Sequence, residues 1–205
     1  MYNISKVRQA WVNYPLQYDW NIFGTLNFAV GKKPSHQEAQ RITAAFFNKI
    51  DHLCFGNAHR NQRRFPRYVC THRGSNGDNP HNHFLAFTQH DPKEFSILLN
   101  AIWSGMNGKT AVASENEILP VFSEFAASEY LLHEDRSYQI ESWNETLSHL
   151  SEERGFYRND TLPRLYSVAG RTNPQNDKTY LSDAEDAFEP NLLAASQRFI
   201  RRNPK

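Results

Sequence analysis

Two histidines separated by a single residue, His81 and His83, stand at the start of an apolar run in DNPHNHFLAF (residues 78–87). Successive side chains of a β-strand point to opposite faces, so both imidazoles would project from the same face. The opposite face would carry Asn82, Phe84 and Ala86. Two imidazoles on one strand face can bind a single metal ion. The alternative for this pair alone is two solvated histidines on the outer side of a half-buried strand.

A third histidine, His72, lies near the end of RRFPRYVCTHRG (residues 63–74), which is typical of a strand centred on Tyr68 to Thr71. The turn-forming residues SNGDNP follow it and predict an antiparallel hairpin. This hairpin places His72 close to His81, although a bulge in so long a loop leaves open which face His72 occupies. On the same face the three histidines would form an open site for a divalent cation. On the other face His72 would be an ordinary surface residue.

The histidines need a sheet to position them, and the segments before them supply its first parts. WNIFGTLNFAV (residues 20–30) alternates apolar and polar residues, which predicts a strand. One side of this strand would carry Ile22, Gly24, Leu26 and Phe28. Ser35 and Glu38 then form a capping box at the start of a helix that extends to Phe55.

The segments after the histidines continue the alternation of strands and helices. DPKEFSILLNAIWSGM predicts a second helix over residues 91–106, with Asp91 as its cap. Further elements are a strand within 111–122, a short helix within 123–135, a last strand at 162–170 and a helix around 191–201. This order predicts an α+β fold, in which helices flank a central antiparallel sheet in a ferredoxin-like arrangement. We expect one domain at residues 1–170, then a linker and C-terminal helix of unknown role at 171–205.

Composition limits the classes of partner. The chain has 205 residues, 39% of them hydrophobic, and a net charge of +1, so it has the core of a folded domain but no overall basic character. An anionic partner must therefore meet local patches. The main patch contains Arg63, Arg64 and Arg67, which we take as candidate DNA-binding residues, and a second lies in the tail at 196–205. The alternative is that both patches are solvated surface.

Cysteine usage and hydropathy bear on the compartment. The two cysteines, Cys54 and Cys70, form no CxxC pair, and the sequence has no secretory pattern. No apolar run approaches the length needed to span a bilayer. We therefore expect a reducing, cytosolic setting and no membrane partner.

Four stretches in a fixed order carry a family resemblance: FGTLNF (23–28), THRG (71–74), PHNHFLAF (80–87) and FAASEYLLHE (125–134). They resemble the HUH endonucleases (His, hydrophobic residue, His), in particular the rolling-circle replication initiators of plasmids, phages and small single-stranded DNA viruses. FGTLNF is similar to the family's first motif, F-x-T-L-T-F. His72 matches the position where viral members carry a third metal ligand, often glutamate.

The resemblance covers about residues 20–136 and includes two departures. Asn82 takes the place of the usual hydrophobic residue between the histidines. YLLH, residues 130–133, stands where the family has Y-x-x-K, so His133 replaces a lysine that helps to position phosphate.

The resemblance implies a site-specific single-stranded DNA endonuclease that forms a covalent 5′-phosphotyrosine and so initiates rolling-circle replication. Tyr130 would be the nucleophile, with His133 and Glu134 as assistants. His72, His81 and His83 would hold Mg²⁺ or Mn²⁺. The partners would be single-stranded or hairpin DNA at a replication origin and a host helicase. The resemblance also implies a place in the cytoplasm of a bacterial or archaeal host of a mobile element, or in the host cell nucleus if the source is a eukaryotic virus.

The chemistry suits a tyrosine beside a cation. A phenoxide is a competent leaving group, so a phosphotyrosine bond can later be used to rejoin the strand. Because the pKa of an ordinary tyrosine is about 10, a nearby cation must favour its ionised form or polarise the phosphate. Tyr130 is one of nine tyrosines and would otherwise be a core residue; Tyr138 is its main rival.

Three other functions remain open at this point. The same chemistry also serves HUH transposases and relaxases. A three-histidine metal hydrolase would use a metal-bound water in place of the tyrosine. A non-catalytic nucleic-acid-binding domain would carry the histidines incidentally and bind DNA in a salt-dependent way.

Overall fold

The computed structural model describes residues 4–28, 34–57, 63–74, 77, 79–106, 117–121, 123–132, 142–150, 157–171, 185–186, 188 and 190. Its centre is a four-stranded sheet in the order β2-β3-β1-β4, in which every pair of neighbours is antiparallel. The strands are β1 (Ile22–Leu26), β2 (Arg67–His72), β3 (His81–Ala86) and β4 (Glu117–Pro120). This confirms the predicted α+β fold with an antiparallel sheet.

Two long helices each connect strands that are not neighbours in the sheet. Helix α2 (His36–Phe55) links β1 to β2, and α3 (Pro92–Met106) links β3 to β4. Because a third strand lies between the linked strands in each case, the connectivity is that of two interleaved βαβ units, as in ferredoxin-like folds. Both helices begin where the sequence predicts, since Ser35 accepts a hydrogen bond from Glu38 N (3.2 Å) and Asp91 from Glu94 N (2.8 Å).

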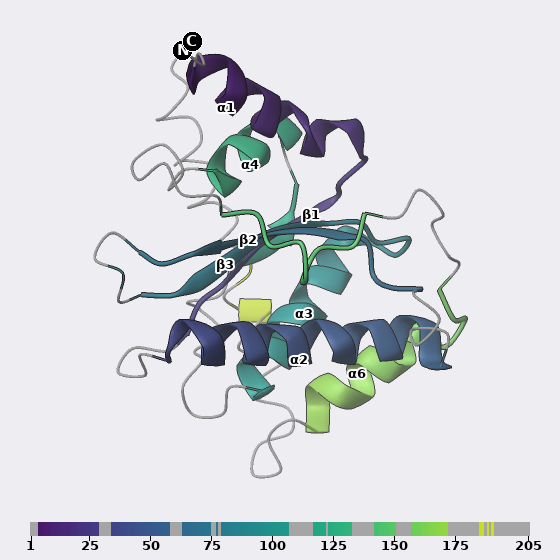
Figure 1. The fold of residues 1–205 in the computed structure, drawn as a ribbon. Helices are drawn as coiled ribbons and strands as arrows, with labels where there is room; N and C mark the ends of the chain where they lie inside the picture. Colours follow the sequence, from purple (N-terminus) through teal and green to yellow (C-terminus); the bar gives the residue numbers. More distant parts are fainter. Residues whose placement is uncertain are drawn as a thin grey trace.

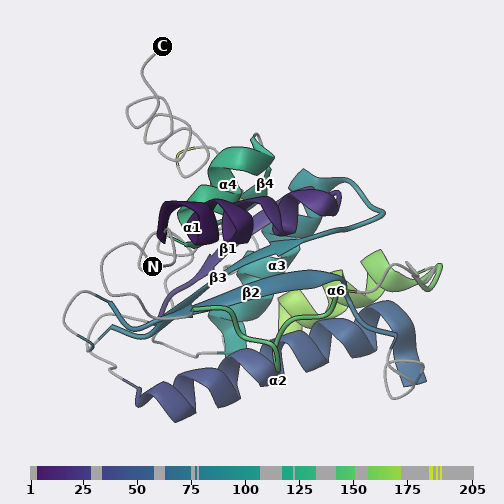
Figure 2. The ribbon, with the colours of Figure 1, turned by 45° about the horizontal axis from the view of Figure 1, so that its top comes forward.

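Helices cover both faces of the sheet, so the molecule has three layers (Figures 1 and 2). Helices α2 and α3 lie on one face, and α6 (Thr161–Arg171) packs against them. On the other face lie α1 (Ile4–Asn13) and α4 (Glu124–Leu131), with the short 3₁₀ turn η1 (Pro15–Gln17) nearby.

Each face of the sheet contributes to its own hydrophobic cluster. The larger cluster includes Ile22, Leu26 and Phe84 from the strands and many apolar residues of α2 and α3. The smaller one lies under α1 and α4, and we call it the small core; its buried members are Val12, Trp20, Tyr68, Cys70, Leu85, Leu131 and Leu132. The histidine-bearing side of β3 therefore faces α1 and α4.

Gly24 on β1 leaves room for the ring of Phe84 on the neighbouring strand β3. It is paired with Phe84, and a Cβ atom at Gly24 would lie only 2.1 Å from a ring carbon of Phe84. That ring is fully buried and meets Phe47 of α2 edge-on. The glycine of FGTLNF is thus needed because an aromatic ring occupies the space of its side chain.

The outer edge of β2 is covered by residues 142–150. Backbone hydrogen bonds join Arg67 to His149 in both directions, and Asn144 N donates to Val69 O. Isolated bridges pair Arg67 with His149 and Cys70 with Trp143. These contacts satisfy backbone groups that an open sheet edge would leave exposed.

One predicted element is wrong, and one helix is missing from the prediction. The predicted last strand at 162–170 is part of helix α6, because Leu165 and Ala169 point into the larger cluster at helical spacing. Helix α1 was not predicted, since Val12 is its only fully buried residue among those whose side chains the structure describes. The predicted helix around 191–201 lies outside the described residues.

Candidate metal centre

Three histidines meet on the face of the sheet that α1 and α4 cover. His72 is the direct cross-strand partner of His81, and His83 follows two residues later on the same face of β3. One potential ligand atom from each of the three lies within 4.8 Å of the other two. His72 and His83 are each 1% exposed, and His81 is half-buried. The structure therefore confirms that three histidines lie close enough together to bind one metal ion, with His72 on the required face.

Backbone carbonyls determine which ring nitrogen of His72 and His81 faces the cluster as a ligand. Nε2 of His72 lies 2.8 Å from the carbonyl oxygen of Leu131, and Nδ1 of His81 lies 2.9 Å from that of Asn79. A carbonyl only accepts hydrogen bonds, so each of these nitrogens carries the proton and donates. The lone pair is then on Nδ1 of His72 and on Nε2 of His81.

His83 is oriented by a threonine of the neighbouring strand. Its Nδ1 lies 2.9 Å from Oγ1 of Thr25 on β1, and the residue paired with Thr25 in the register is His83 itself. A threonine hydroxyl can accept a hydrogen bond, so Nδ1–H can donate to it and leave the lone pair on Nε2. Metal-ligating histidines usually donate their second ring N–H to a neighbour in this way.

These contacts make the triad chemically suited to ligate a metal ion. Three neutral imidazoles would each offer one lone pair, from two strands whose relative position is fixed by the hairpin register. An all-nitrogen set favours first-row transition ions over Mg²⁺, which prefers oxygen ligands and retains water. The residues therefore fit a divalent transition ion.

Tyr130, the predicted nucleophile, lies beside this triad. It belongs to α4, and its ring centroid is 4.9 Å from that of His83 and 5.7 Å from that of Phe23 on β1. Tyr130 is half-buried, so its ring is packed while part of its surface remains accessible. The structure thus brings together four of the six residues to which the sequence analysis assigns chemistry; the other two, His133 and Glu134, lie outside the described residues.

Helix α4 is capped by a serine at its start and is held in place by contacts with α1, the small core and His72. Ser123 caps its start by accepting a hydrogen bond from Ala126 N (3.4 Å). Ser128 donates to the carbonyl oxygen of Val12 in α1 (2.6 Å), and Leu131 is buried in the small core. The bond from His72 to Leu131 adds a direct link between α4 and the candidate ligands.

The polar residue between His81 and His83 has a structural explanation. Asn82 is fully buried on the opposite face of β3, where its amide donates to Oγ1 of Thr43 in α2 (2.8 Å). Its side-chain oxygen accepts a hydrogen bond from Thr71 of β2 (2.8 Å), and Asn144 donates to the same Thr71 hydroxyl (2.9 Å). Asn82 therefore joins α2, β3, β2 and the edge segment where a hydrophobic residue would only pack.

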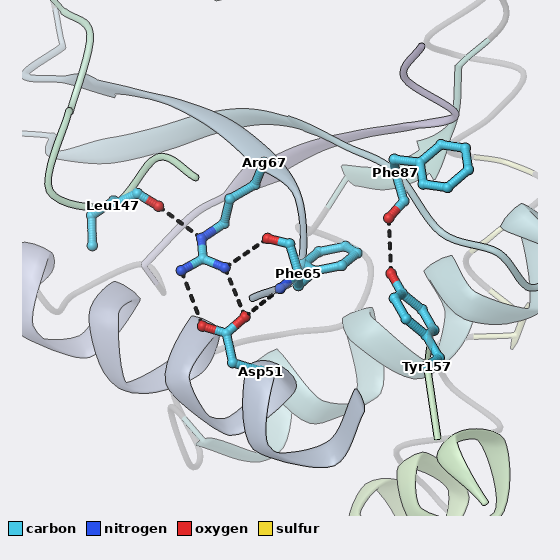
Figure 3. A network of polar contacts seen from close by, with 6 residues as sticks. All are labelled: Asp51, Phe65, Arg67, Phe87, Leu147 and Tyr157. Atoms are coloured by element: carbon cyan, nitrogen blue, oxygen red, sulfur yellow. Dashed lines mark hydrogen bonds and ion pairs between the residues drawn. The ribbon is translucent and has the colours of Figure 1, made fainter. Parts of the chain in front are cut away.

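The prediction that Arg67 contacts DNA is wrong, because its side chain is buried. It is 2% exposed and forms a two-pronged ion pair with Asp51 of α2, at 2.8 and 3.2 Å (Figure 3). The same guanidinium donates to the carbonyl oxygens of Phe65 (2.8 Å) and Leu147 (2.7 Å). These bonds occupy four of the five N–H donors of the guanidinium, so the group is not available to a phosphate at the surface.

Arg63 and Arg64, the other two candidate DNA-binding arginines, lie before β2, and Arg73 lies after it. Arg63 is exposed and Arg64 half-buried, but both precede β2, whereas His72 ends it. Arg64 acts electrostatically on Arg67 and His149 at the start of β2, and the strand from Arg67 to His72 alone spans roughly 16 Å, so the arginines before it are not brought to the triad. Arg73 follows His72 directly and is exposed. The predicted basic patch of Arg63, Arg64 and Arg67 does not include Arg73, although its adjacency to His72 is a signal in the sequence.

Tyr157 and Tyr166, the two tyrosines after Tyr130 that the structure describes, are engaged on the other face of the sheet. The hydroxyl of Tyr157 donates to the carbonyl oxygen of Phe87 (2.9 Å; Figure 3), and burial raises the pKa of Tyr157 well above its usual value. Tyr166 of α6 donates to Glu94 (2.7 Å). The predicted assistants His133 and Glu134, and the rival Tyr138, lie outside the described residues.

Comparison of the chain with protein-family models, with curated proteins and with solved structures finds no match. Among the described helices, none combines the length and the hydropathy required to cross a bilayer. The fold and the site therefore define an α+β protein with a three-histidine cluster beside a tyrosine.

Proposed function

We propose that the protein is a metal-dependent endonuclease of the HUH type, which cuts single-stranded DNA by transesterification and so starts rolling-circle replication of a plasmid, phage or virus. The observation that supports this most strongly is the position of Tyr130 against His83, 4.9 Å between ring centroids, beside three histidines that can share one ion. The FGTLNF stretch at 23–28, which is similar to the first motif of the replication initiators, favours an initiator over other enzymes with the same chemistry.

In this proposal Tyr130 is the nucleophile. Its phenolic oxygen forms a bond to the scissile phosphorus, and the bond from that phosphorus to the 3′ oxygen of the preceding nucleotide breaks. The proton of the phenol is lost, and the departing 3′ oxygen takes up a proton, so the products are a 5′-phosphotyrosine and a free 3′-hydroxyl. The number of phosphoester bonds is unchanged, which makes the reaction reversible and allows the strand to be rejoined.

The triad would hold the divalent ion that this reaction needs. A cation bound there supplies charge neutralisation on the scissile phosphate. The chain's own contribution is orientation, because two of the three ligands lie on one rigid hairpin strand and the third is their cross-strand neighbour. The ring of Tyr130 is kept beside them by its edge-on contacts with His83 and Phe23.

Single-stranded or hairpin DNA from an origin is the proposed substrate, and a host helicase is a proposed partner. The scissile phosphate has to reach Tyr130 and the triad, so the DNA must lie over the α4 side of the β2–β3 hairpin. Arg73 is the described arginine next to a ligand, and its exposed side chain suits contact with a neighbouring phosphate.

The test is a denaturing gel of protein incubated with Mn²⁺ and single-stranded oligonucleotides drawn from candidate origin hairpins. We expect a slowly migrating protein–DNA adduct that disappears in Tyr130→Phe. Tyr166→Phe is the matched control, because it removes an exposed hydroxyl from α6 on the other side of the sheet, and its adduct should persist.

Two outcomes would contradict the proposal. Cleavage by Tyr130→Phe at the parent rate would exclude Tyr130 as nucleophile. Free cleavage products without an adduct, dependent on the histidines but unaffected by Tyr130→Phe, would favour a three-histidine hydrolase that uses water.

A further inference from the structure

His72 contacts both the candidate metal centre and the helix that carries Tyr130. Its Nδ1 side belongs to the cluster with His81 and His83, whereas its Nε2–H donates to the carbonyl oxygen of Leu131 at 2.8 Å. Leu131 is the last residue of α4 and follows Tyr130 directly. A single buried imidazole therefore joins the ligand cluster to the backbone one residue from the proposed nucleophile.

The two ends of this imidazole are coupled electronically. Binding of a cation at one ring nitrogen draws electron density from the ring and makes the N–H at the other nitrogen a stronger, charge-assisted donor. The acceptor is well suited to respond, because the last carbonyls of a helix lack donors within the helix and lie at the negative end of its dipole. A metal ion at the triad should therefore strengthen the bond from His72 to Leu131.

His81 lacks this second connection to α4. Its Nδ1–H donates to Asn79, in the turn of its own hairpin. The two cross-strand partners are thus alike as candidate ligands but differ in what they hold with their other nitrogen.

We propose that His72 is a positioning residue as well as a ligand: metal binding at the triad tightens the His72–Leu131 hydrogen bond and thereby fixes the C-terminal end of α4, and with it Tyr130, against the sheet. This inference rests on the metal centre of the proposed function but does not require Tyr130 to react with DNA. Without metal the nucleophile helix is held more loosely, so the nucleophile is fully ordered only when the ion is present.

The first test is hydrogen–deuterium exchange of peptides covering α4, residues 124–132, with and without saturating Mn²⁺. In the wild-type protein we expect Mn²⁺ to slow exchange in this helix by about fivefold or more, the lower end of typical couplings between two sites. The matched variants are His72→Ala and His81→Ala, each measured at a Mn²⁺ concentration that saturates that variant by calorimetry. Mn²⁺ should still protect α4 in His81→Ala and should fail to protect it in His72→Ala.

The outcomes separate this inference from the proposed function. Mn²⁺ binding with unchanged exchange in α4, or equal loss of protection in both variants, would overturn the coupling and leave the metal centre intact. Failure of the wild-type protein to bind Mn²⁺ would overturn the metal centre and the coupling together.

A second test leaves all three histidines unchanged. Coupling between two sites is reciprocal, so loosening α4 must weaken metal binding. Ser123→Ala removes the cap of α4, and we expect it to raise the Kd for Mn²⁺ by several-fold. Ser35→Ala is the control, since it removes the cap of α2 on the opposite face and should leave the Kd unchanged. Equal effects of the two substitutions, or none from Ser123→Ala, would contradict the proposal.

Discussion

Thr25 acts at the candidate site without being a ligand. Its hydroxyl lies 2.9 Å from Nδ1 of His83 and can hold that imidazole in the tautomer that presents Nε2. Thr25→Val keeps the shape of the side chain and removes the hydroxyl, so we expect the Kd for Mn²⁺ to rise about tenfold, as for other residues that orient a metal ligand. Calorimetry on protein stripped of metal would measure it.

The control for this change is Thr43→Val, which removes a buried hydroxyl from the other face of the sheet, where it accepts a hydrogen bond from Asn82. It should lower stability but leave Mn²⁺ affinity unaltered. A Thr25→Val protein that binds Mn²⁺ as tightly as the parent would show that the hydroxyl does not orient His83.

Arg73 offers a prediction about DNA at the same scale. Because it is exposed and adjacent to His72, we expect Arg73→Ala to weaken single-stranded DNA binding without changing metal affinity. Loss of one phosphate contact should also reduce the slope of log K against log salt by about 0.7. Arg158→Ala, which removes an exposed arginine paired with Asp160 beside α6, should change neither quantity. Equal slopes for Arg73→Ala and the parent would remove Arg73 from the DNA-binding surface.

At the scale of elements, the Asp51–Arg67 pair holds α2, β2 and the edge segment together. Arg67 donates to Asp51 and to Leu147, and Asp51 also accepts from Phe65 N (Figure 3). Removing one partner of a buried pair leaves the other charge uncompensated, so Arg67→Met and Asp51→Leu should each destabilise the protein by about 3–5 kcal/mol. Urea unfolding would measure these losses.

The double variant distinguishes a coupled pair from two independent contacts. Asp51→Leu/Arg67→Met should lose less stability than the sum of the two single variants, by at least about 1 kcal/mol. The same cycle on the exposed pair Arg158 and Asp160 should show a much smaller coupling. Additive losses for the buried pair would mean that Arg67 acts mainly through its carbonyl contacts.

The elements also show what periodicity can and cannot predict. Period-two alternation placed His81 and His83 on one face and Phe84 on the other, and the structure agrees. The face of His72 required the register of the hairpin, which depends on how the turn closes. The helix at 161–171 was predicted as a strand because its short apolar run, with Leu165 and Val168, fits either period.

Arg67 illustrates a limit that no local pattern overcomes. Its sequence neighbours form a basic cluster, which indicates a surface patch. Its partner, Asp51, lies 16 residues earlier in a helix, and only the packing of α2 on the sheet brings the two together. Thr25 was missed for the same reason, since its contact with His83 depends on a strand pairing 58 residues apart.

At the scale of the whole molecule, stability should fall in mild acid. Burial, followed by the positive charge of Arg67, lowers the pKa of His149 in the folded protein below its usual 6.5, and burial likewise lowers the pKa of His90. Below pH 6.5 the unfolded chain binds protons that the folded chain binds less readily, so stability is complete above pH 6.5 and decreases as the pH falls through the lowered values.

The measurement is the urea midpoint of metal-free protein at pH 7.5 and 5.5. His149→Gln should show a smaller drop between these two pH values than the parent does. An unchanged drop would mean that His149 does not contribute to the acid sensitivity, even though its backbone joins the edge segment to Arg67.

The central claim is that His72, His81 and His83 form one metal centre, and calorimetric titration of metal-stripped protein with Mn²⁺ tests it most directly. We predict one ion per chain for the parent, a loss of at least tenfold in affinity for His83→Asn, and parental affinity for His90→Asn, whose histidine stacks on Phe95 away from the triad. Equal Mn²⁺ affinity and stoichiometry in the parent and His83→Asn, or no binding by the parent, would contradict the account.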